Sequence, residues 1–322
     1  MNNYTWLEQK LHSIALSSQF MREVLFDIEC SISNPRFSSS NPVFVVGLAR
    51  SGTTIILNAI YKSEEFASLS YADMPFILAP NLWASISKNK INQPLVERAH
   101  GDGIKVSSES PEAFEEVFWN TYPHHDSESH GKFKQFVDII CHKYQRKRYL
   151  SKNNQNIKRL ELLTSIYKDA IVFIPFRDPV QHVNSLISQH LKFIKDSKED
   201  PFISDYMKWI GHTEFGTHYN PISSENLNFL DTSDPNHWLE QWYLTYQMIY
   251  EKLKDNPNYH FLSYEKICND SRVWSNIIDL IRINKRYDFD FKVSKKNVDF
   301  NFNSDLRDKS MDLYKQLNFE SL

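Results

Sequence analysis

Short apolar runs alternate along this chain with longer segments whose apolar residues recur every three or four positions. The runs are rich in β-branched and aromatic residues, which favours strands, whereas the spacing in the longer segments favours helices. Strands are predicted at residues 43–46, 66–71, 149–152, 170–176 and 260–263, with a further extended segment at 104–107. Strands and helices in this alternation are typical of a central parallel sheet flanked by helices, so the predicted fold class is α/β.

The first segment of helical periodicity lies before the first strand. Its apolar residues, spaced by three or four, predict one amphipathic helix over residues 4–30, and a polar, serine-rich link follows at 31–41. We therefore expect an N-terminal helical arm and linker at residues 1–40 and a main domain at 41–322. The arm packs on that domain or on a second copy of the chain.

The remaining helices are expected between and after the strands. Pro75 and Pro111 are each expected in the first turn of a helix, where proline is tolerated. Residues 211–235 are rich in polar residues and proline, which indicates a long surface loop or lid. Further helices are predicted at 132–148, 153–167, 179–194, 201–211, 238–253, 271–283 and 305–317.

The stretch NPVFVVGLARSGTTIILN at residues 41–58 joins the first strand to the first helix of the main domain. Gly47 ends the strand, and Gly52 stands just before the helix. In such a loop the backbone N–H groups converge at the positive end of the helix dipole, which is a binding site for an anion. The sequence therefore predicts an anion site here.

The cation of this loop is Arg50, whereas Thr53 occupies the position where a nucleoside-triphosphate P-loop requires lysine. A guanidinium suits a two-pronged contact with an oxygen-rich phosphate or sulfate group. RSGTT after an apolar strand resembles the 5′-phosphosulfate loop of sulfotransferases that use 3′-phosphoadenosine 5′-phosphosulfate (PAPS). The alternative is a glycine turn that binds no ligand.

A second element of the same resemblance follows the strand at 170–176. Arg177-Asp178-Pro179 leads into a helix that carries Ser185, which is similar to the 3′-phosphate element of these enzymes. Read alone, Arg177 and Asp178 form a structural pair equally well. Lys152 after another strand resembles the lysine that the family has ahead of a helix, although a surface lysine gives the same pattern.

The resemblance implies a P-loop NTPase-like three-layer fold and transfer of a sulfuryl group from PAPS to a hydroxyl or amine. It implies two sets of site residues. The donor-binding set is Gly47, Arg50, Ser51, Gly52, Thr53, Thr54, Arg177 and Ser185, and the catalytic set is Asp73, Arg50, Lys152 and His100. Relatives with this loop have a carboxylate after the second strand that acts as general base, and Asp73 is the nearest match. Its competitors are His100, Asp102, Glu112, Glu115 and Glu116.

Two departures narrow the resemblance. Ile55 stands where small-molecule sulfotransferases have an adenine-stacking tryptophan, and no glycine follows Gly216, so their C-terminal glycine-rich segment is missing. The chain therefore resembles the bacterial and carbohydrate- or protein-modifying branch. The acceptor, a carbohydrate or small molecule, and the adenine contacts are not identified by any motif.

Composition and charge exclude several other classes. The net charge of −3 and pI near 6.5 argue against a nucleic-acid-coating surface, and the basic run at 143–148 is typical of a solvated helix end. Three separated cysteines fit reduced thiols and imply no zinc site, and no signal peptide or membrane span is readable, so a cytoplasmic location is expected. A P-loop kinase or NTPase and a non-catalytic nucleotide-binding module are the alternative functions.

Overall fold

The computed structural model describes residues 5–33, 35, 38–87, 96–97, 105–124, 126–223, 227–292 and 300–322. Its centre is a five-stranded sheet in the order β2-β5-β1-β6-β7, in which every neighbouring pair is parallel. The strands are β1 (Val43–Val45), β2 (Phe66–Ala67), β5 (Arg148–Lys152), β6 (Ile171–Phe176) and β7 (Tyr259–Ser263). A separate antiparallel pair joins β3 (Val96–Glu97) and β4 (Lys105–Val106). The predicted α/β class with a central parallel sheet is confirmed.

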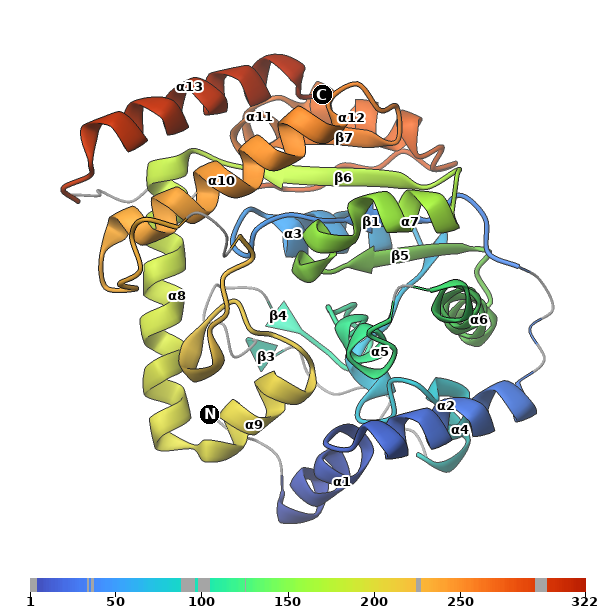
Figure 1. The fold of residues 1–322 in the computed structure, drawn as a ribbon. Coiled ribbons are helices and arrows are strands. Elements are labelled where there is room, and N and C mark those ends of the chain that lie inside the picture. The colour runs from blue at the N-terminus through green and yellow to red at the C-terminus, as the bar shows by residue number, and fades with distance from the viewer. Residues whose placement is uncertain are drawn as a thin grey trace.

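Helices cover both faces of this sheet, as Figure 1 shows. Alternate residues of β1 face opposite layers, because Val43 and Val45 pack against α3, α11 and α12 while Phe44 packs with the cluster that includes α6, α7 and α10. All three are fully buried. The result is the three-layer arrangement expected of a parallel sheet.

The helices of the main domain mostly match the predicted segments. Their bounds are α3 (Thr53–Tyr61), α4 (Pro80–Ile86), α5 (Glu116–Thr121), α6 (Ser127–Tyr144), α7 (Leu160–Ile166), α8 (Pro179–Glu199), α9 (Pro201–Trp209), α10 (Pro235–Leu253), α11 (Tyr264–Asn269), α12 (Ser271–Leu280) and α13 (Ser304–Glu320). Short 3₁₀ turns occur at η1 (Tyr71–Asp73), η2 (Asn154–Arg159) and η3 (Gly216–His218). Residues 211–235 contain no other helix or strand in their described part, in agreement with the predicted loop.

The N-terminal arm is two helices, α1 (Trp6–Leu16) and α2 (Gln19–Ile32), where the sequence predicted one. The chain breaks at Ser18, whose hydroxyl caps the first turn of α2. The Arg22 guanidinium bonds Leu16 O across the break and, at 2.7 Å, the Thr121 hydroxyl. Phe26 lies in the same core cluster as the sheet, so the arm packs on the main domain.

Two predicted helix starts were wrong. Helix α4 begins at Pro80 rather than in the turn that contains Pro75, and α5 begins at Glu116 rather than near Pro111. The physical reason is a tertiary contact. The backbone of residues 69–72 bonds that of residues 108–112, through Ala72 N to Ser108 O (2.7 Å) and Glu112 N to Leu69 O (3.0 Å), which holds both segments out of α-helical geometry.

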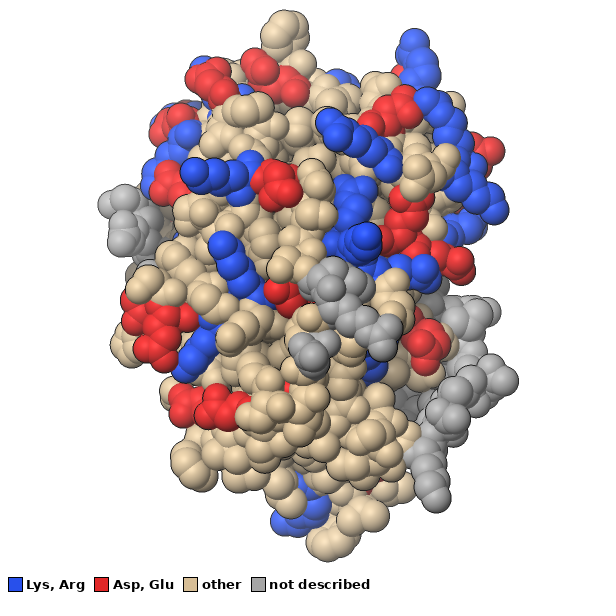
Figure 2. All heavy atoms as spheres, turned by 90° about the vertical axis from the view of Figure 1, so that its right-hand side faces the viewer, with Lys and Arg blue, Asp and Glu red and all other residues tan. Residues whose placement is uncertain are grey.

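The amino ends of the strands lie on the right-hand side of Figure 1, and Figure 2 shows that face with acidic and basic side chains interspersed. The basic run at 143–148 is partly used in the structure. Arg148 lies over the Phe66 ring at 4.3 Å and donates to the Ile281 and Asn41 carbonyl oxygens. Among the described residues, no helix is long and apolar enough to cross a membrane.

Candidate active site

The loop between β1 and α3 has two positions that only glycine fits. A Cβ on Gly47 would lie 2.9 Å from Pro175 O, which is a backbone atom of the neighbouring strand β6. Gly52 has φ +101°, and a Cβ there would lie 2.5 Å from the Tyr264 ring. Glycine is therefore required at both positions, because any side chain would come too close to its neighbours. At Gly52 it is required also because the backbone is left-handed.

Helix α3 begins at the end of this loop without a side-chain cap. Gly52 is its N-cap residue and has no side chain that could accept from the N–H groups of the first turn. Ser51 and Thr53 are buried at 0% and 3% exposure. The uncapped start of α3, next to a compact loop, is the physical basis for the anion site that the sequence predicts.

Arg50 is held in the left-handed region at φ +71°, which is unusual for a residue with a long side chain. Its Nε donates to the Ser185 hydroxyl at 3.2 Å. Ser185 lies on α8, whose start follows strand β6. The structure thus brings together residues from the two sequence motifs, far apart in the chain.

The start of α8 is fixed from two sides. The Asp178 carboxylate accepts from Gln181 N at 2.9 Å and caps the helix, while Asp178 N donates to Glu265 Oε1 at 3.1 Å. This capping gives Asp178 a structural role. The Tyr264-Glu265 pair, a weak motif in the sequence, therefore supports both elements, because Tyr264 packs on Gly52 and Glu265 holds the start of α8.

His182 is a site residue that sequence reasoning missed. Its ring is fully buried, and Nε2 lies 2.8 Å from Ala49 O in the loop. Because a carbonyl oxygen only accepts, Nε2 carries the hydrogen and Nδ1 does not. Burial, together with the positive charges of Arg177 and Arg50, lowers the pKa of His182 to about 3, so the ring is neutral at physiological pH. His182 lies one helical turn before Ser185, a spacing that could have indicated its place.

The other two predicted cations lie at the same edge of the sheet. Lys152 ends β5 and is paired in register with Val45 of β1, just ahead of the loop. Arg177 follows β6, and its guanidinium lies 5.6 Å from the centre of the Tyr264 ring, which itself covers Gly52. Arg50, Lys152 and Arg177 thus come from three adjacent segments to one edge, where parallel α/β sheets bind ligands.

Asp73 lies elsewhere. Its carboxylate is fully buried, is paired with the Lys143 ammonium, and accepts from Tyr144 Oη and Ser70 N, both at 2.7 Å. Lys143 and Tyr144 end α6 and precede β5, so these partners come from the amino side of the sheet. Within the described part of the chain, Asp73 makes no hydrogen bond or ion pair with the loop at 47–52. The expectation that Asp73 is the general base gains no support from this geometry.

The competing acids are also engaged. Glu115 accepts from Trp119, Tyr149 and Asn156, and Glu116 is paired with Arg159 and accepts from Asn153. Glu112 accepts from the Tyr71 hydroxyl at 2.9 Å. His100 and Asp102 lie outside the described residues. Within those residues, no group of three or more metal-ligating side chains is found.

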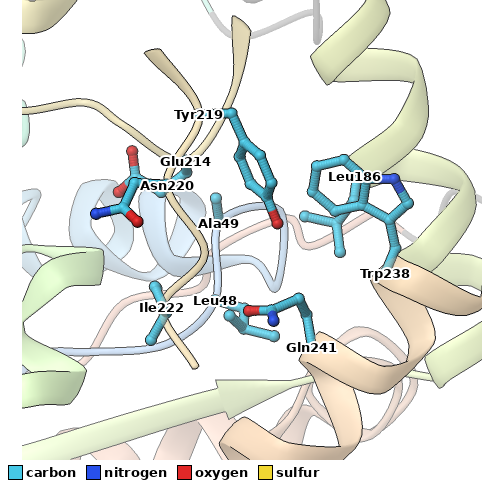
Figure 3. A pocket seen from close by; sticks show the side chains of 9 residues that line it. All are labelled: Leu48, Ala49, Leu186, Glu214, Tyr219, Asn220, Ile222, Trp238 and Gln241. Carbon is cyan, nitrogen blue, oxygen red and sulfur yellow. The ribbon is translucent and has the colours of Figure 1, made fainter. Parts of the chain in front are cut away.

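A pocket opens beside the loop, between α8, α10 and the segment at 211–223 (Figure 3). Leu48 and Ala49 of the loop form its floor, and Leu186, next to Ser185, forms part of its wall. The residues that complete it are Glu214, Tyr219, Asn220, Ile222, Trp238 and Gln241. None of them was predicted as a site residue, because they belong to the long loop at 211–235 and to α10, and neither segment carries a recognisable motif.

Comparisons with known proteins agree with the sequence motifs. A model of the sulfotransferase family matches residues 42–212. No curated protein sequence matches the chain. Among solved structures, sulfotransferase STF1 from Mycobacterium tuberculosis is 13% identical with a TM-score of 0.46, covering 95% of this chain and 81% of that one.

Two further solved structures are similar to the same extent. Sulfotransferase STF9 from Mycobacterium avium is 11% identical with a TM-score of 0.45, covering 98% and 79% of the two chains. The sulfotransferase domain from the curacin biosynthetic pathway is 10% identical with a TM-score of 0.41, covering 89% and 100%. The family is established by the sequence match over more than half of the chain, which includes the motifs around Arg50 and Arg177. The chain belongs to the sulfotransferase family and is an enzyme of sulfuryl transfer.

Proposed function

We propose that the donor of the sulfuryl group is PAPS, and that the acceptor is a hydroxyl or amine of a second substrate. The observation that carries this proposal is the contact between Arg50 and Ser185, 3.2 Å, which joins a 5′-phosphosulfate loop to a 3′-phosphate element. PAPS carries phosphate groups at both the 3′ and the 5′ position of its ribose, so it suits two adjacent phosphate-binding elements. A donor with a single phosphate chain needs only the first.

The roles follow from position and charge. The loop N–H groups, Ser51, Thr53 and Thr54 hold the 5′-phosphosulfate, and Arg177 with Ser185 holds the 3′-phosphate. Sulfuryl transfer, like phosphoryl transfer, passes through a loose transition state, so the enzyme mainly positions the groups and stabilises charge on the leaving phosphate. Arg50 and Lys152 supply that positive charge.

His182 keeps the loop in place for this purpose. Its Nε2–H fixes the carbonyl of Ala49, directly before Arg50, and so helps to hold Arg50 in its left-handed conformation. A neutral ring donates this bond without adding a further charge to the anion site. The acceptor proton must pass to a positioned base; the sequence candidates for this base are Asp73 and its competitors His100, Asp102, Glu112, Glu115 and Glu116.

The competing function is a nucleotide kinase or NTPase. Calorimetric titration with adenosine 3′,5′-bisphosphate, ATP and ADP, each with and without magnesium, separates the two. We expect the bisphosphate to bind more tightly than ATP and to do so without magnesium. Magnesium-dependent ATP binding in preference to the bisphosphate would contradict the proposal and favour a kinase.

A further inference from the structure

We infer that the protein has a second ligand site, for a small organic anion with an apolar body, at the edge of the sheet opposite the donor site. A cavity of about 440 Å³ lies at this edge, where strands β1, β5, β6 and β7 begin and α12 ends. This volume is typical of cavities that bind small molecules. The same edge of the molecule faces the viewer in Figure 2. The site would be additional to those for the sulfuryl donor and the acceptor.

The cavity is separate from the donor site. Arg148, which lines the cavity, begins β5, whereas Lys152 ends the same strand at the edge that carries Arg50 and Arg177. Four residues of a strand span about 13 Å, so the packed sheet lies between the two edges. No residue of the loop at 47–52 lines the cavity. A ligand in the cavity therefore leaves the donor site free.

Two arginines line the cavity, and they are close enough for their charges to interact. The Arg148 guanidinium is fixed, because its Nε donates to Asn41 O at 3.2 Å and its Nη1 to Ile281 O at 2.5 Å. The Arg282 guanidinium makes no hydrogen bond or ion pair with any described residue. A guanidinium in this state is available for a charge-assisted contact with a carboxylate or phosphate group. The pair therefore favours an anionic ligand.

The acidic side chains nearby do not neutralise both arginines. In the described part of the chain, Asp169 is the only carboxylate that lines the cavity, and its Oδ2 already accepts from Asn41 N at 2.7 Å. Glu65, a further acid close to this cavity, accepts from the backbone and side-chain amides of Asn284 at 2.8 and 2.9 Å. Burial lowers the pKa of His260, so this lining residue is neutral at physiological pH. The lining thus has two positive charges and one negative charge.

Much of the remaining lining is apolar. Leu280 and Ile281 at the end of α12, Ile171 at the start of β6, and Pro257 contribute hydrocarbon. The side-chain amide of Asn258 is already occupied, because its Nδ2 donates to two backbone carbonyl oxygens at 2.6 and 3.1 Å. An inorganic ion would leave the apolar walls in contact with water, whereas a ring or an alkyl chain covers them. The expected ligand therefore combines one anionic group with an apolar body.

The first experiment compares three probes by calorimetric titration at neutral pH. 2-Naphthoate has both the anionic group and the ring, 2-naphthamide has the ring without the charge, and acetate has the charge without the ring. We expect 2-naphthoate to bind about tenfold or more tightly than either of the other two, because only it uses both the arginines and the apolar walls. Equal binding of 2-naphthoate and 2-naphthamide, or no binding of 2-naphthoate, would overturn the inference.

A second experiment locates the bound probe. Arg282→Asn removes one of the two positive charges, and asparagine tolerates the left-handed backbone at this position, where φ is +53°. The dissociation constant of 2-naphthoate should rise by about tenfold. Arg286→Asn is the matched control, because Arg286 is an exposed arginine four residues further on that does not line the cavity. Equal effects of the two substitutions would show that the anion binds elsewhere.

The third experiment reverses the change of charge. Asp169→Asn removes the carboxylate of the lining, while the amide oxygen of asparagine is still able to accept from Asn41 N. 2-Naphthoate should then bind about threefold more tightly, and a weaker or unchanged affinity would contradict the assignment. An excess of adenosine 3′,5′-bisphosphate should not displace 2-naphthoate from the wild-type protein. Displacement would show that the anion occupies the donor site, and it would overturn the inference of a second site.

Discussion

Two charged regions lie near the sheet, and they differ in the charged side chains that they bring together. Around Asp73 one carboxylate is matched by the Lys143 ammonium, and its remaining capacity is filled by Tyr144 and Ser70. At the carboxyl edge, adjacent segments bring three cations together, which are Arg50, Lys152 and Arg177.

The two regions have different roles, because the first stabilises the fold and the second indicates a ligand site. A closed pair such as Asp73–Lys143 satisfies itself and needs nothing from outside. Several cations brought to one sheet edge beside the uncapped start of a helix attract an anion, so their convergence indicates a ligand.

Arg50→Ala should lower kcat by about 10³-fold or more, because we propose that its charge stabilises the leaving phosphate. Steady-state assays with PAPS and any accepted acceptor measure this. Arg272→Ala removes an exposed guanidinium, 86% accessible, and serves as control with unchanged turnover. Retention of more than about a tenth of wild-type kcat in Arg50→Ala would contradict the assignment.

Asp73→Asn should reduce the free energy of unfolding by roughly 3 kcal/mol, because the Lys143 ammonium, only 13% exposed, loses its counter-charge. Urea unfolding measures this loss, and Tyr144→Phe, which removes one hydrogen bond, should cost about 1 kcal/mol. Turnover per folded molecule should stay near wild type. The opposite pattern, unchanged stability with kcat lower by roughly 10²–10⁴, would establish Asp73 as the general base after all.

Arg177→Ala should weaken binding of adenosine 3′,5′-bisphosphate by about 1.5–3 kcal/mol, the usual range for a charge-assisted contact. Calorimetry with adenosine 5′-monophosphate provides the control, since this ligand lacks the 3′-phosphate and should bind the variant and the wild type alike. If both ligands lost affinity equally, Arg177 would act on the whole site and not on the 3′-phosphate.

His182 should make stability depend on pH. Its folded pKa, about 3, lies below the unfolded value of 6.5, so the unfolded chain takes up the proton first and stability falls as the pH drops below 6.5. The contribution is roughly 1.5 kcal/mol between pH 6.5 and about pH 5. His182→Gln lacks this titration, so its unfolding free energy should fall less over that range, and an identical pH profile would refute the shift.

The same position tests the loop contact at neutral pH. An amide N–H of glutamine reaches approximately where Nε2 lies, whereas that of asparagine is nearer to Nδ1, so His182→Gln should keep more activity than His182→Asn. The effect on kcat should correspond to the loss of one hydrogen bond, about 1 kcal/mol. Equal activity of the two variants would show that the bond to Ala49 does not position the loop.

The sequence was informative where the determinants are local. Gly47, Gly52 and the start of α3 follow one another within a few residues, and backbone geometry alone makes such a loop an anion site. The parallel sheet was likewise readable, because each strand is a contiguous apolar run between helices. The family match over residues 42–212 agrees with the resemblance found from these motifs.

Other features depend on contacts that no local pattern encodes. Asp73 was chosen by its distance along the chain, yet its surroundings are determined by Lys143 and Tyr144 from a distant helix. Helices α4 and α5 start later than predicted because their expected first turns bond to each other. The pocket is built from a long loop and from α10, whose aromatic stripe is mostly core, so only its position beside Ala49 reveals it.

The contact between Tyr264 and Gly52 has a practical consequence for how the protein can be divided. The match to the family ends at residue 212, whereas Tyr264 stands after β7, far beyond that boundary. A fragment of residues 42–212 would lose the ring that covers the loop, the strand that pairs with β6 and the Tyr246 hydroxyl that bonds Pro175 O at 2.7 Å. It would also present β6 as an unpaired edge, which favours aggregation. The evolutionary unit recognised in the sequence is therefore shorter than the unit that folds, and expression of this protein in pieces should retain the chain through β7 and α11.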